Sequence, residues 1–366
     1  MGNYRIAVLP GDGIGPEVTR EALKVLSAVE KSIPDLHFHF EEYPVGARCY
    51  LETGTDLSLE TLQACKRADA ILFGAAGLPD VRGKDGTEIL PQLTLRFALD
   101  LYAGIRPIKR FEGVPSVLSG NRPIDYVIIR ENTEGLYASR GGGVRLGDEM
   151  TVDNMVITRK GTERVVRWAF SLARGRKGAP LDGKRRVDCV DKANVLKGMA
   201  FFREVFDQVA SEFPEIIAGY AYVDAMALYL VRQPEKFDVL VMENMFGDIL
   251  SDLAAGTIGG LGLAPSADLG DQYGLFQASH GTAPDIAGKG IANPLAQILS
   301  AAMMLDWLGE RKADLQAEKG AKAIEQAVAN VLGDFRNHTA DIGGKASTEG
   351  VGDAVAQEVE RMVALQ

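Results

Sequence analysis

Two aspartates lie four residues apart in the segment Glu243–Asp252, directly after the apolar run Phe237–Met242. On a helix, Asp248 and Asp252 are spaced i and i+4, so both carboxylates lie on one face. Neighbouring carboxylates repel each other unless a cation or a proton lies between them. Hard oxygen ligands at this spacing suit Mg²⁺ or Mn²⁺, which completes its coordination with water and substrate. The alternative is that both acids only serve the helix N-terminus, through capping and the helix dipole.

A third aspartate, Asp224, lies in the otherwise apolar stretch Tyr222–Ala227, where a strand is expected to lead into a helix. A single acid in such a place is costly to bury unless it is paired or bound to a metal ion. A helix N-cap explains the same residue equally well.

Three arginines form a second group of candidates. Arg96 and Arg106 flank the segment Phe97–Ile105, and Arg130 ends the predicted strand that begins at Asp125. Guanidinium groups pair bidentately with carboxylates, so converging arginines suit a substrate that carries several carboxylates. Each arginine alone is more often an ordinary surface charge. The interpretation therefore depends on their occurrence together with the acids.

Lys192 lies just after the predicted strand Arg186–Val190, at the kind of strand end where α/β proteins gather their ligand sites. Next to a metal ion and a tyrosine, the pKa of a lysine can fall far enough for general-base catalysis. An ordinary surface lysine is the alternative.

The segment His280–Pro294 is long for a simple connection, and it carries several residue types that contact polar ligands. Asp285 can accept hydrogen bonds from both hydroxyls of a ribose, and its charge would repel a 2′-phosphate.

A glycine-rich turn, Gly11–Gly15, stands between a predicted strand and a predicted helix. Its pattern, G-x-G-x-G followed by Pro16, lacks the third glycine of the dinucleotide-binding fingerprint and is not a Walker A loop. A tight turn before a helix that begins near a proline is the favoured interpretation.

The elements that must position these residues alternate between strand and helix. Strands are predicted at Tyr4–Leu9, His37–Phe40, Ala68–Gly74, Ile124–Ile129 and Phe237–Met242, with a helix between the first two that runs to about Ser32. From Leu295 the chain is mostly helical. This order predicts an α/β fold with a largely parallel sheet.

A polar, glycine-rich stretch, Ser139–Gly143, precedes strand-like Thr151–Val152 and Met155–Thr158. The pattern predicts a hairpin arm. Such an arm often pairs with another subunit, and a surface loop is the alternative.

The chain has 366 residues, with 40 Lys+Arg and 50 Asp+Glu, and its net charge is −10. Its length predicts two domains. The acidic balance argues against a nucleic-acid or anionic-membrane binder, because each phosphate contact needs Lys or Arg. Three scattered cysteines without a C-x-x-C pair indicate reduced thiols. No signal peptide or membrane span is visible, so we expect a cytoplasmic protein.

Seven motifs make the sequence resemble the isocitrate/isopropylmalate dehydrogenase family of metal-dependent β-decarboxylating dehydrogenases, over essentially the whole chain. They are GDGIGPE, LRFALDLYAGIRP, IRENTEGLY, DKANVL, FDVLVMENMFGDILSD, GGLGLAPS and HGTAPDIAGKGIANP. The resemblance implies a two-domain α/β homodimer without a Rossmann fingerprint. Residues 1–101 and 259–366 would form a discontinuous cofactor-binding domain. Residues 102–258 would form the substrate and dimerisation domain, with a hairpin arm at about 139–158.

The resemblance also implies a role for each candidate residue. The substrate contacts would be Gln92, Leu93, Arg96, Arg106 and Arg130. The acid–base pair would be Tyr137 and Lys192, the latter supplied by the partner subunit. The ligands of Mg²⁺ or Mn²⁺ would be Asp248 and Asp252 of one subunit and Asp224 of the other. The cofactor contacts would be His280, Gly281, Asp285, Ile286 and Asn293. Because Asp285-Ile286 stands where NADP-dependent relatives carry Lys-Tyr, the cofactor would be NAD.

The implied reaction is the oxidative decarboxylation of a (2R)-malate-type 2-hydroxy diacid. The segment Glu88–Leu93 should face the substituent at C3, and it is mixed, because Ile89 and Leu93 are apolar whereas Gln92 is polar. IRENTE resembles the isocitrate, homoisocitrate and tartrate/malate branches, whereas DKANVL resembles the isopropylmalate branch. We predict 3-isopropylmalate as the substrate, with homoisocitrate/isocitrate and D-malate/tartrate as alternatives. A non-catalytic regulatory subunit is the alternative from a different class.

Overall fold

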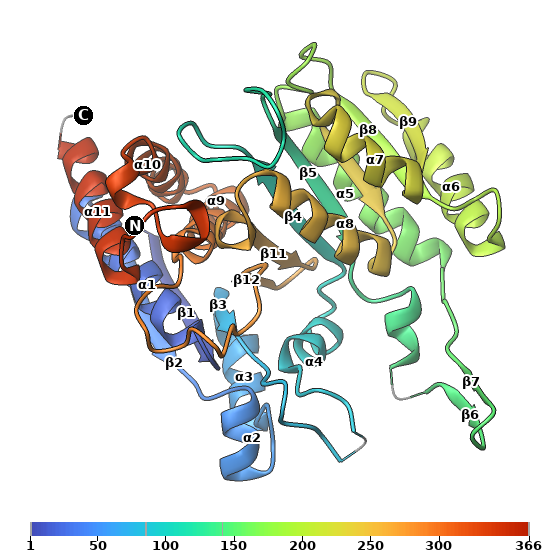
Figure 1. Cartoon of the computed structure of the whole chain (residues 1–366), viewed down its shortest axis with the longest axis horizontal. Helices are drawn as coiled ribbons and strands as arrows, with labels where there is room; N and C mark the ends of the chain where they lie inside the picture. Colours follow the sequence, from blue (N-terminus) through green and yellow to red (C-terminus); the bar gives the residue numbers. More distant parts are fainter. Residues whose placement is uncertain (1, 85, 141, 365–366) are drawn as a thin grey trace. The chain divides into compact units, whose positions relative to one another are not determined.

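The computed structural model describes residues 2–84, 86–140 and 142–364. They form two compact units (Figure 1). The first unit comprises Met1–Leu99, Phe111–Pro115 and Gly259–Gln366, and the second comprises Asp100–Arg110 and Ser116–Ile258. None of the described helices is long and apolar enough to cross a membrane.

The segment Phe111–Pro115 belongs to the first unit, although the predicted range 102–258 placed it in the second. Val114 is buried, and its Cγ1 would lie 2.7 Å from a Cβ at Gly259. Gly113 approaches the carbonyl oxygen of Leu332 in a similar way. These contacts join residues far apart in the sequence, so local patterns do not reveal them. The cofactor and substrate roles of the two units stay predictions.

The first unit contains a mixed sheet. Its strands, in spatial order, are β2 (Leu36–Glu42), β1 (Gly2–Gly11), β3 (Ala70–Ala75), β12 (Gly274–Ala278) and β11 (Pro265–Leu269). Neighbouring strands are parallel except β11 and β12, which are antiparallel. β3 and β12 are buried along their whole length.

Helices complete the first unit. They are α1 (Gly15–Ser32), α2 (Ala47–Thr53), α3 (Leu59–Arg67), α4 (Pro91–Ala98), α9 (Leu295–Lys312), α10 (Leu315–Leu332) and α11 (Thr348–Ala364). Short 3₁₀ turns occur at η3 (Leu261–Leu263), η4 (Phe335–Asn337) and η5 (Ala340–Ile342). In α1, Val18, Ala22 and Val25 recur at helical spacing and are fully buried.

The glycine-rich turn before α1 confirms the tight-turn interpretation. Gly11 and Gly13 have positive φ angles of 76° and 58°, which only glycine adopts without strain. Between them, the buried carboxylate of Asp12 accepts three backbone hydrogen bonds. The donors are the N–H groups of Ala47 at 2.6 Å, Arg48 at 2.9 Å and Gly77 at 2.9 Å. The turn therefore fixes the start of α2 and the loop after β3.

The second unit also contains β-strands. Its strands, in spatial order, are β4 (Ala103–Lys109), β5 (Asp125–Glu131), β10 (Val239–Met242), β8 (Arg186–Asp191) and β9 (Ile217–Tyr222). β4 is antiparallel to β5, and the other pairs are parallel. The α/β prediction is thus confirmed in both units. The four parallel strands end at one edge of the sheet, and ligand sites of α/β proteins gather at such an edge.

The helices of the second unit are α5 (Arg159–Gly175), α6 (Lys197–Ala210), α7 (Val223–Arg232) and α8 (Asn244–Thr257), with 3₁₀ turns η1 (Leu136–Ser139) and η2 (Pro234–Lys236). The α5 helix buries one apolar face that includes Val165, Val166 and Phe170.

A short antiparallel pair, β6 (Val144–Leu146) and β7 (Met150–Val152), forms an exposed arm of the second unit. The predicted strand at Met155–Thr158 is wrong. Val156 instead makes an isolated bridge with Gly135, which ties the base of the arm to the segment before η1. Gly141, within the predicted arm, lies outside the described residues.

Candidate active site

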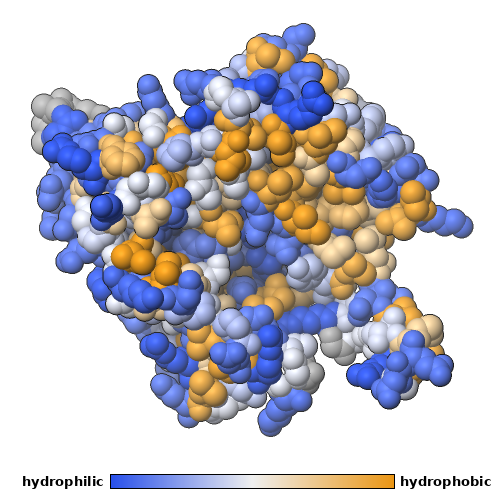
Figure 2. Space-filling model, in the orientation of Figure 1, coloured by the Kyte–Doolittle hydropathy of each residue, from blue (hydrophilic) through white to orange (hydrophobic). Residues whose placement is uncertain are grey.

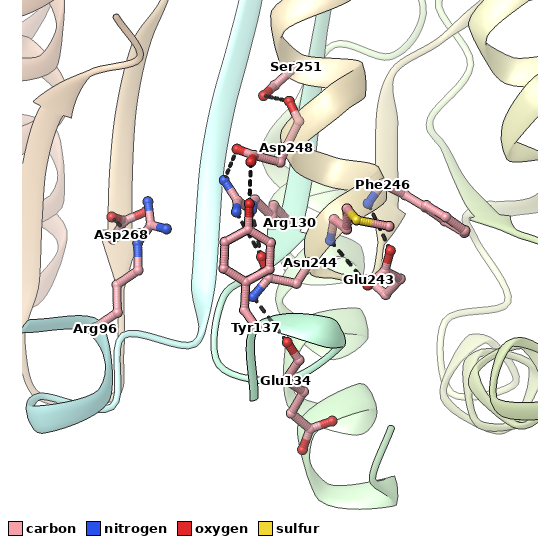
Figure 3. A network of polar contacts seen from close by, with 11 residues as sticks. Arg96, Arg130, Glu134, Tyr137, Glu243, Asn244, Phe246, Asp248, Ser251 and Asp268 are labelled. Atoms are coloured by element: carbon pink, nitrogen blue, oxygen red, sulfur yellow. Dashed lines mark hydrogen bonds and ion pairs between the residues drawn. The ribbon is translucent and has the colours of Figure 1, made fainter. Parts of the chain in front are cut away.

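The side chains of Arg130 and Tyr137, both in the second unit, meet at Asp248 (Figure 3). The Nη1 of Arg130 and the hydroxyl of Tyr137 each donate to a different carboxylate oxygen of Asp248, the latter over 2.7 Å. The guanidinium of Arg130 also lies over the Tyr137 ring, 5.3 Å from its centroid. Arg130 is buried, whereas 43% of the Asp248 side chain is exposed. A positive charge and a hydroxyl thus converge on a carboxylate that ligands can reach.

The helix cap next to this cluster is Glu243. Its carboxylate accepts hydrogen bonds from the backbone N–H groups of Met245 and Phe246 at 3.1 and 2.8 Å. Asp248 and Asp252 lie one and two turns further along α8. The capping explanation for these two aspartates is therefore wrong, because Glu243 caps the helix.

Gly247 allows α8 to lie against Arg130. A Cβ at Gly247 would come within 2.6 Å of the Cβ and Cγ of Arg130. We therefore expect Gly247→Ala to displace α8 and to lower the free energy of unfolding by about 1–3 kcal/mol, measured as a lower Tm. Gly256→Ala in the same helix is the matched control. A Cβ at Gly256 meets nothing within 4 Å, so this change should stabilise the helix by up to about 1 kcal/mol. Equal Tm values for the two variants would contradict this explanation.

Asp252 and Tyr137 both have raised pKa values. For Asp252, partial burial of the carboxyl is the main cause and the negative charge of Asp248 adds to it, while Arg106 and Arg130 oppose it. For Tyr137, burial comes first and the hydrogen bond to Asp248 second. Arg106 lies buried on β4. The site therefore holds two mutually repelling carboxylates, which suit a divalent cation, beside two buried arginines, which suit the carboxylates of a substrate.

Lys192 and Asp224 form a separate pair. The Nζ of Lys192 donates to Oδ1 of Asp224 over 2.5 Å, and this lysine lowers the pKa of Asp224. Tyr222 is the N-cap residue of α7, so Asp224 lies inside the first turn of α7 and the N-cap explanation for it is wrong. The Lys192 side chain is 28% exposed, and its catalytic role stays a prediction.

Within the described ranges, no three His, Cys, Asp or Glu side chains lie close enough together to hold a metal ion. A single chain therefore does not bring Asp224 into one group with Asp248 and Asp252. The chemistry of Asp248 and Asp252, two carboxylates on one exposed helix face, still fits a hard cation that takes one or two protein carboxylates.

In the first unit, α4 carries three of the predicted substrate contacts. The Nε of Arg96 donates to Oδ2 of the fully buried Asp268 over 2.8 Å. Leu93 is buried, and the Oε1 atom of Gln92 is buried without a hydrogen-bond partner among the described residues. The carboxylate of Asp268 thus fixes the Arg96 side chain, and the substrate roles of all three residues stay predictions.

The predicted cofactor loop packs on the start of α1. Ile286 contacts the small core cluster of Ile14, Val18 and Ala292. Asp285 and Gly281 are exposed. The remaining two predicted contacts are His280 and Asn293. Burial lowers the pKa of His280, so this imidazole is neutral at physiological pH.

Asn293 is held by protein groups. It accepts a hydrogen bond from the N–H of Leu295 at 3.0 Å and donates one to Asp341 at 3.1 Å. The position therefore stabilises the end of the loop, and a contact with a cofactor stays a prediction.

Two residues of the cluster were not predicted from the sequence. Asn244 accepts hydrogen bonds from Nε and Nη2 of Arg130 at 3.0 and 2.7 Å. Glu131 accepts hydrogen bonds from the N–H groups of Thr133 at 2.9 Å and Glu134 at 2.6 Å, and burial raises its pKa to about 7. Both fix the surroundings of Arg130 and Tyr137. Their place directly at strand ends is the only signal in the sequence.

Residues 5–355 match the family model described as isocitrate/isopropylmalate dehydrogenase. The chain is 46% identical to the 3-isopropylmalate/3-methylmalate dehydrogenase of Methanocaldococcus jannaschii, covering 97% of this chain and 99% of that protein. It is 41% identical to the homoisocitrate dehydrogenase of the same organism, covering 98% of each. The crystal structure of isocitrate dehydrogenase from Methylococcus capsulatus matches with a TM-score of 0.85 and 38% identity, covering 98% of this chain and 99% of that one.

Proposed function

The chain belongs to the isocitrate/isopropylmalate dehydrogenase family, and we propose that it oxidises and decarboxylates a (2R)-malate-type diacid with NAD and Mg²⁺ or Mn²⁺. It is a decarboxylating dehydrogenase of the isopropylmalate/homoisocitrate type. The observation that carries the finer proposal is the meeting of Arg130, Tyr137 and Asp248 at the edge of a parallel sheet. These three groups supply a carboxylate binder, a proton donor and a metal ligand.

Asp248 and Asp252 would bind the divalent cation, with Asp224 contributed by a second copy of the chain. When bound, NAD⁺ accepts the hydride from C2 of the substrate, and the cation stabilises negative charge on the substrate oxygens. Arg96, Arg106 and Arg130 would hold the substrate carboxylates through bidentate pairs.

Lys192 and Tyr137 would move the protons. Lys192 accepts the proton of the C2 hydroxyl as the carbonyl forms. After CO₂ has left, Tyr137 donates a proton to the carbon that carried the carboxylate. The raised pKa of Tyr137 suits this role, because the hydroxyl keeps its proton at neutral pH.

The cofactor would be NAD rather than NADP. Asp285 is an exposed acid in the loop His280–Pro294, and its negative charge would repel a 2′-phosphate while it accepts hydrogen bonds from ribose hydroxyls. His280, Gly281, Ile286 and Asn293 would complete the contacts. The three cysteines are free and buried, which fits the cytoplasmic location that we propose.

A homodimer would bring Lys192 and Asp224 of one chain close to Asp248 and Asp252 of the other. Apolar side chains gather on the surface over α7 and α8 (Figure 2). They include Leu228, 53% exposed, Val231, 42% exposed, and Ile249, 59% exposed. The arm adds Leu146 and Met150, which are 53% and 49% exposed. Exposed apolar surface of this kind favours association, and a second copy with the same surface satisfies two-fold symmetry.

The substrate would be 3-isopropylmalate, with homoisocitrate/isocitrate and D-malate/tartrate as alternatives. Ile89 and Leu93 are buried in the segment that should face the C3 substituent, and they suit an apolar group. Gln92 in the same segment suits a polar one. The Methanocaldococcus relatives differ in the same way, since one is named for isopropylmalate and methylmalate and the other for homoisocitrate.

A substrate panel tests this proposal. We expect NADH when the protein is mixed with Mn²⁺, NAD⁺ and 3-isopropylmalate, and a lower kcat/KM with isocitrate, homoisocitrate, D-malate and tartrate. NADP⁺ should support a much lower rate than NAD⁺. A higher kcat/KM for another diacid would correct the substrate. No NADH with any of the five would contradict the proposal and favour a non-catalytic subunit.

A further inference from the structure

The proposed general base and one proposed metal ligand lie at the ends of two adjacent strands. β8 and β9 are parallel, with Asp191 paired to Tyr222. Lys192 directly follows Asp191, and Asp224 lies two residues after Tyr222. Whatever fixes these two strand ends therefore also fixes the Lys192–Asp224 pair.

Arg203, on α6, contacts both strand ends. Its Nε and Nη2 atoms donate to the two carboxylate oxygens of Asp191 at 2.7 and 2.8 Å. Its guanidinium carbon also lies 4.9 Å from the ring centroid of Tyr220 and 5.4 Å from that of Tyr222. A planar cation can make both kinds of contact at once, because its edge carries the N–H donors and its face stacks on aromatic rings.

These contacts position Lys192 in two ways, through its backbone and through its side chain. Asp191 is fully buried, and its Oδ1 also accepts a hydrogen bond from the N–H of Ala193 at 2.8 Å. The backbone is thus held on both sides of Lys192. In addition, the Tyr222 ring lies 5.8 Å from Nζ of Lys192. Arg203 itself is not among the residues assigned above to substrate, cofactor or metal.

We propose that Arg203 is a positioning residue that acts through Asp191 and Tyr222 to place Lys192 and Asp224. The inference rests on the roles proposed above for these two residues. The competing explanation is that Arg203 only compensates the buried charge of Asp191. Arg203→Lys separates the two, because lysine keeps the positive charge and lacks the bidentate fork and the flat face.

The first test is steady-state kinetics of Arg203→Lys at a temperature where both proteins are folded. We expect kcat to fall by about 10–100-fold, since a small misplacement of a catalytic group has effects of this size, while KM for NAD⁺ stays unchanged. Arg174→Lys is the matched control. Arg174 lies 4.8 Å from the ring centroid of Phe213 and donates two hydrogen bonds to Glu215, at 2.9 and 2.7 Å. It is exposed and contacts none of the residues proposed for the reaction, so its kcat should equal that of the wild type.

The second test does not depend on activity. The rate at which acetic anhydride modifies Lys192, followed by peptide mass spectrometry at one fixed pH, should rise several-fold in Arg203→Lys and stay unchanged in Arg174→Lys. A lower Tm with wild-type kcat and wild-type Lys192 modification would overturn the proposal in favour of charge compensation. If none of the diacids tested allows the wild type to reduce NAD⁺, the proposed function fails. The modification rates then still decide whether Arg203 positions Lys192.

Discussion

Asp248→Asn is expected to abolish turnover while the chain stays folded. Asparagine keeps the size of the side chain and removes the negative charge that would bind the cation and pair with Arg130. Loss of a metal-bound state removes several kcal/mol of transition-state stabilisation, so kcat should fall by about 10²–10⁴-fold. Arg130 keeps its two hydrogen bonds to Asn244, and Asp248 is partly exposed. Both facts argue for an intact fold.

The measurements for this variant are kcat with saturating substrate, Tm, and Mn²⁺ binding by electron paramagnetic resonance. Asp182→Asn is a suitable control, because Asp182 also pairs with an arginine, Arg186, at 2.5 Å in the same unit and lies outside the proposed site. Its kcat and Mn²⁺ affinity should equal those of the wild type. A normal rate and normal metal dependence of Asp248→Asn would show that the metal assignment is wrong.

Lys192→Met is also expected to cause a large loss of activity. Methionine keeps an unbranched apolar side chain and removes the amine that would accept the hydroxyl proton, so kcat should fall by about 10²–10⁴-fold. The partner left behind, Asp224, is 68% exposed and can be solvated by water, so Tm should change little. The control is Lys197→Met, an exposed lysine at the start of α6. If the two variants have the same kcat, Lys192 is not the base.

Mixing the two inactive variants tests whether two chains share one site. In a mixed dimer of Asp248→Asn with Lys192→Met, one of the two sites would contain an intact Asp248 and an intact Lys192. With random exchange, half of the dimers are mixed, so about a quarter of the wild-type activity should return. Each variant alone would remain inactive. If mixing restores nothing after subunit exchange has been shown, Asp248 and Lys192 act within one chain, and the shared site is wrong.

The local part of this structure could be predicted from the sequence. The apolar run before Glu243 and the i, i+4 spacing of Asp248 and Asp252 depend only on residues close together in the chain. Strand and helix periodicities express the same short-range geometry. The sequence therefore predicts β10, α8 and the common face of the two aspartates, although not that Glu243 is the cap.

The rest depends on contacts between distant residues. Arg96 pairs with Asp268, 172 residues away, and Arg130 with Asn244, 114 residues away. Neither pair leaves a periodic signal, because the packing of whole elements brings the partners together. The requirement for glycine at position 247 is also invisible in the sequence. It arises only because α8 packs against Arg130, where a Cβ would clash. Arg203 gives no signal at all until β8 and β9 are paired.

The discontinuous first unit has a consequence for synthesis on the ribosome. β12 pairs with β3, with Phe276 opposite Leu72, so the ribosome must add about two hundred residues before β3 gains this neighbour. At about 5–20 residues per second, the edge of β3 stays unpaired for roughly 10–40 s. The second unit is almost continuous and can fold within that interval. Until then the nascent chain exposes an apolar strand edge of the kind that chaperones protect from aggregation.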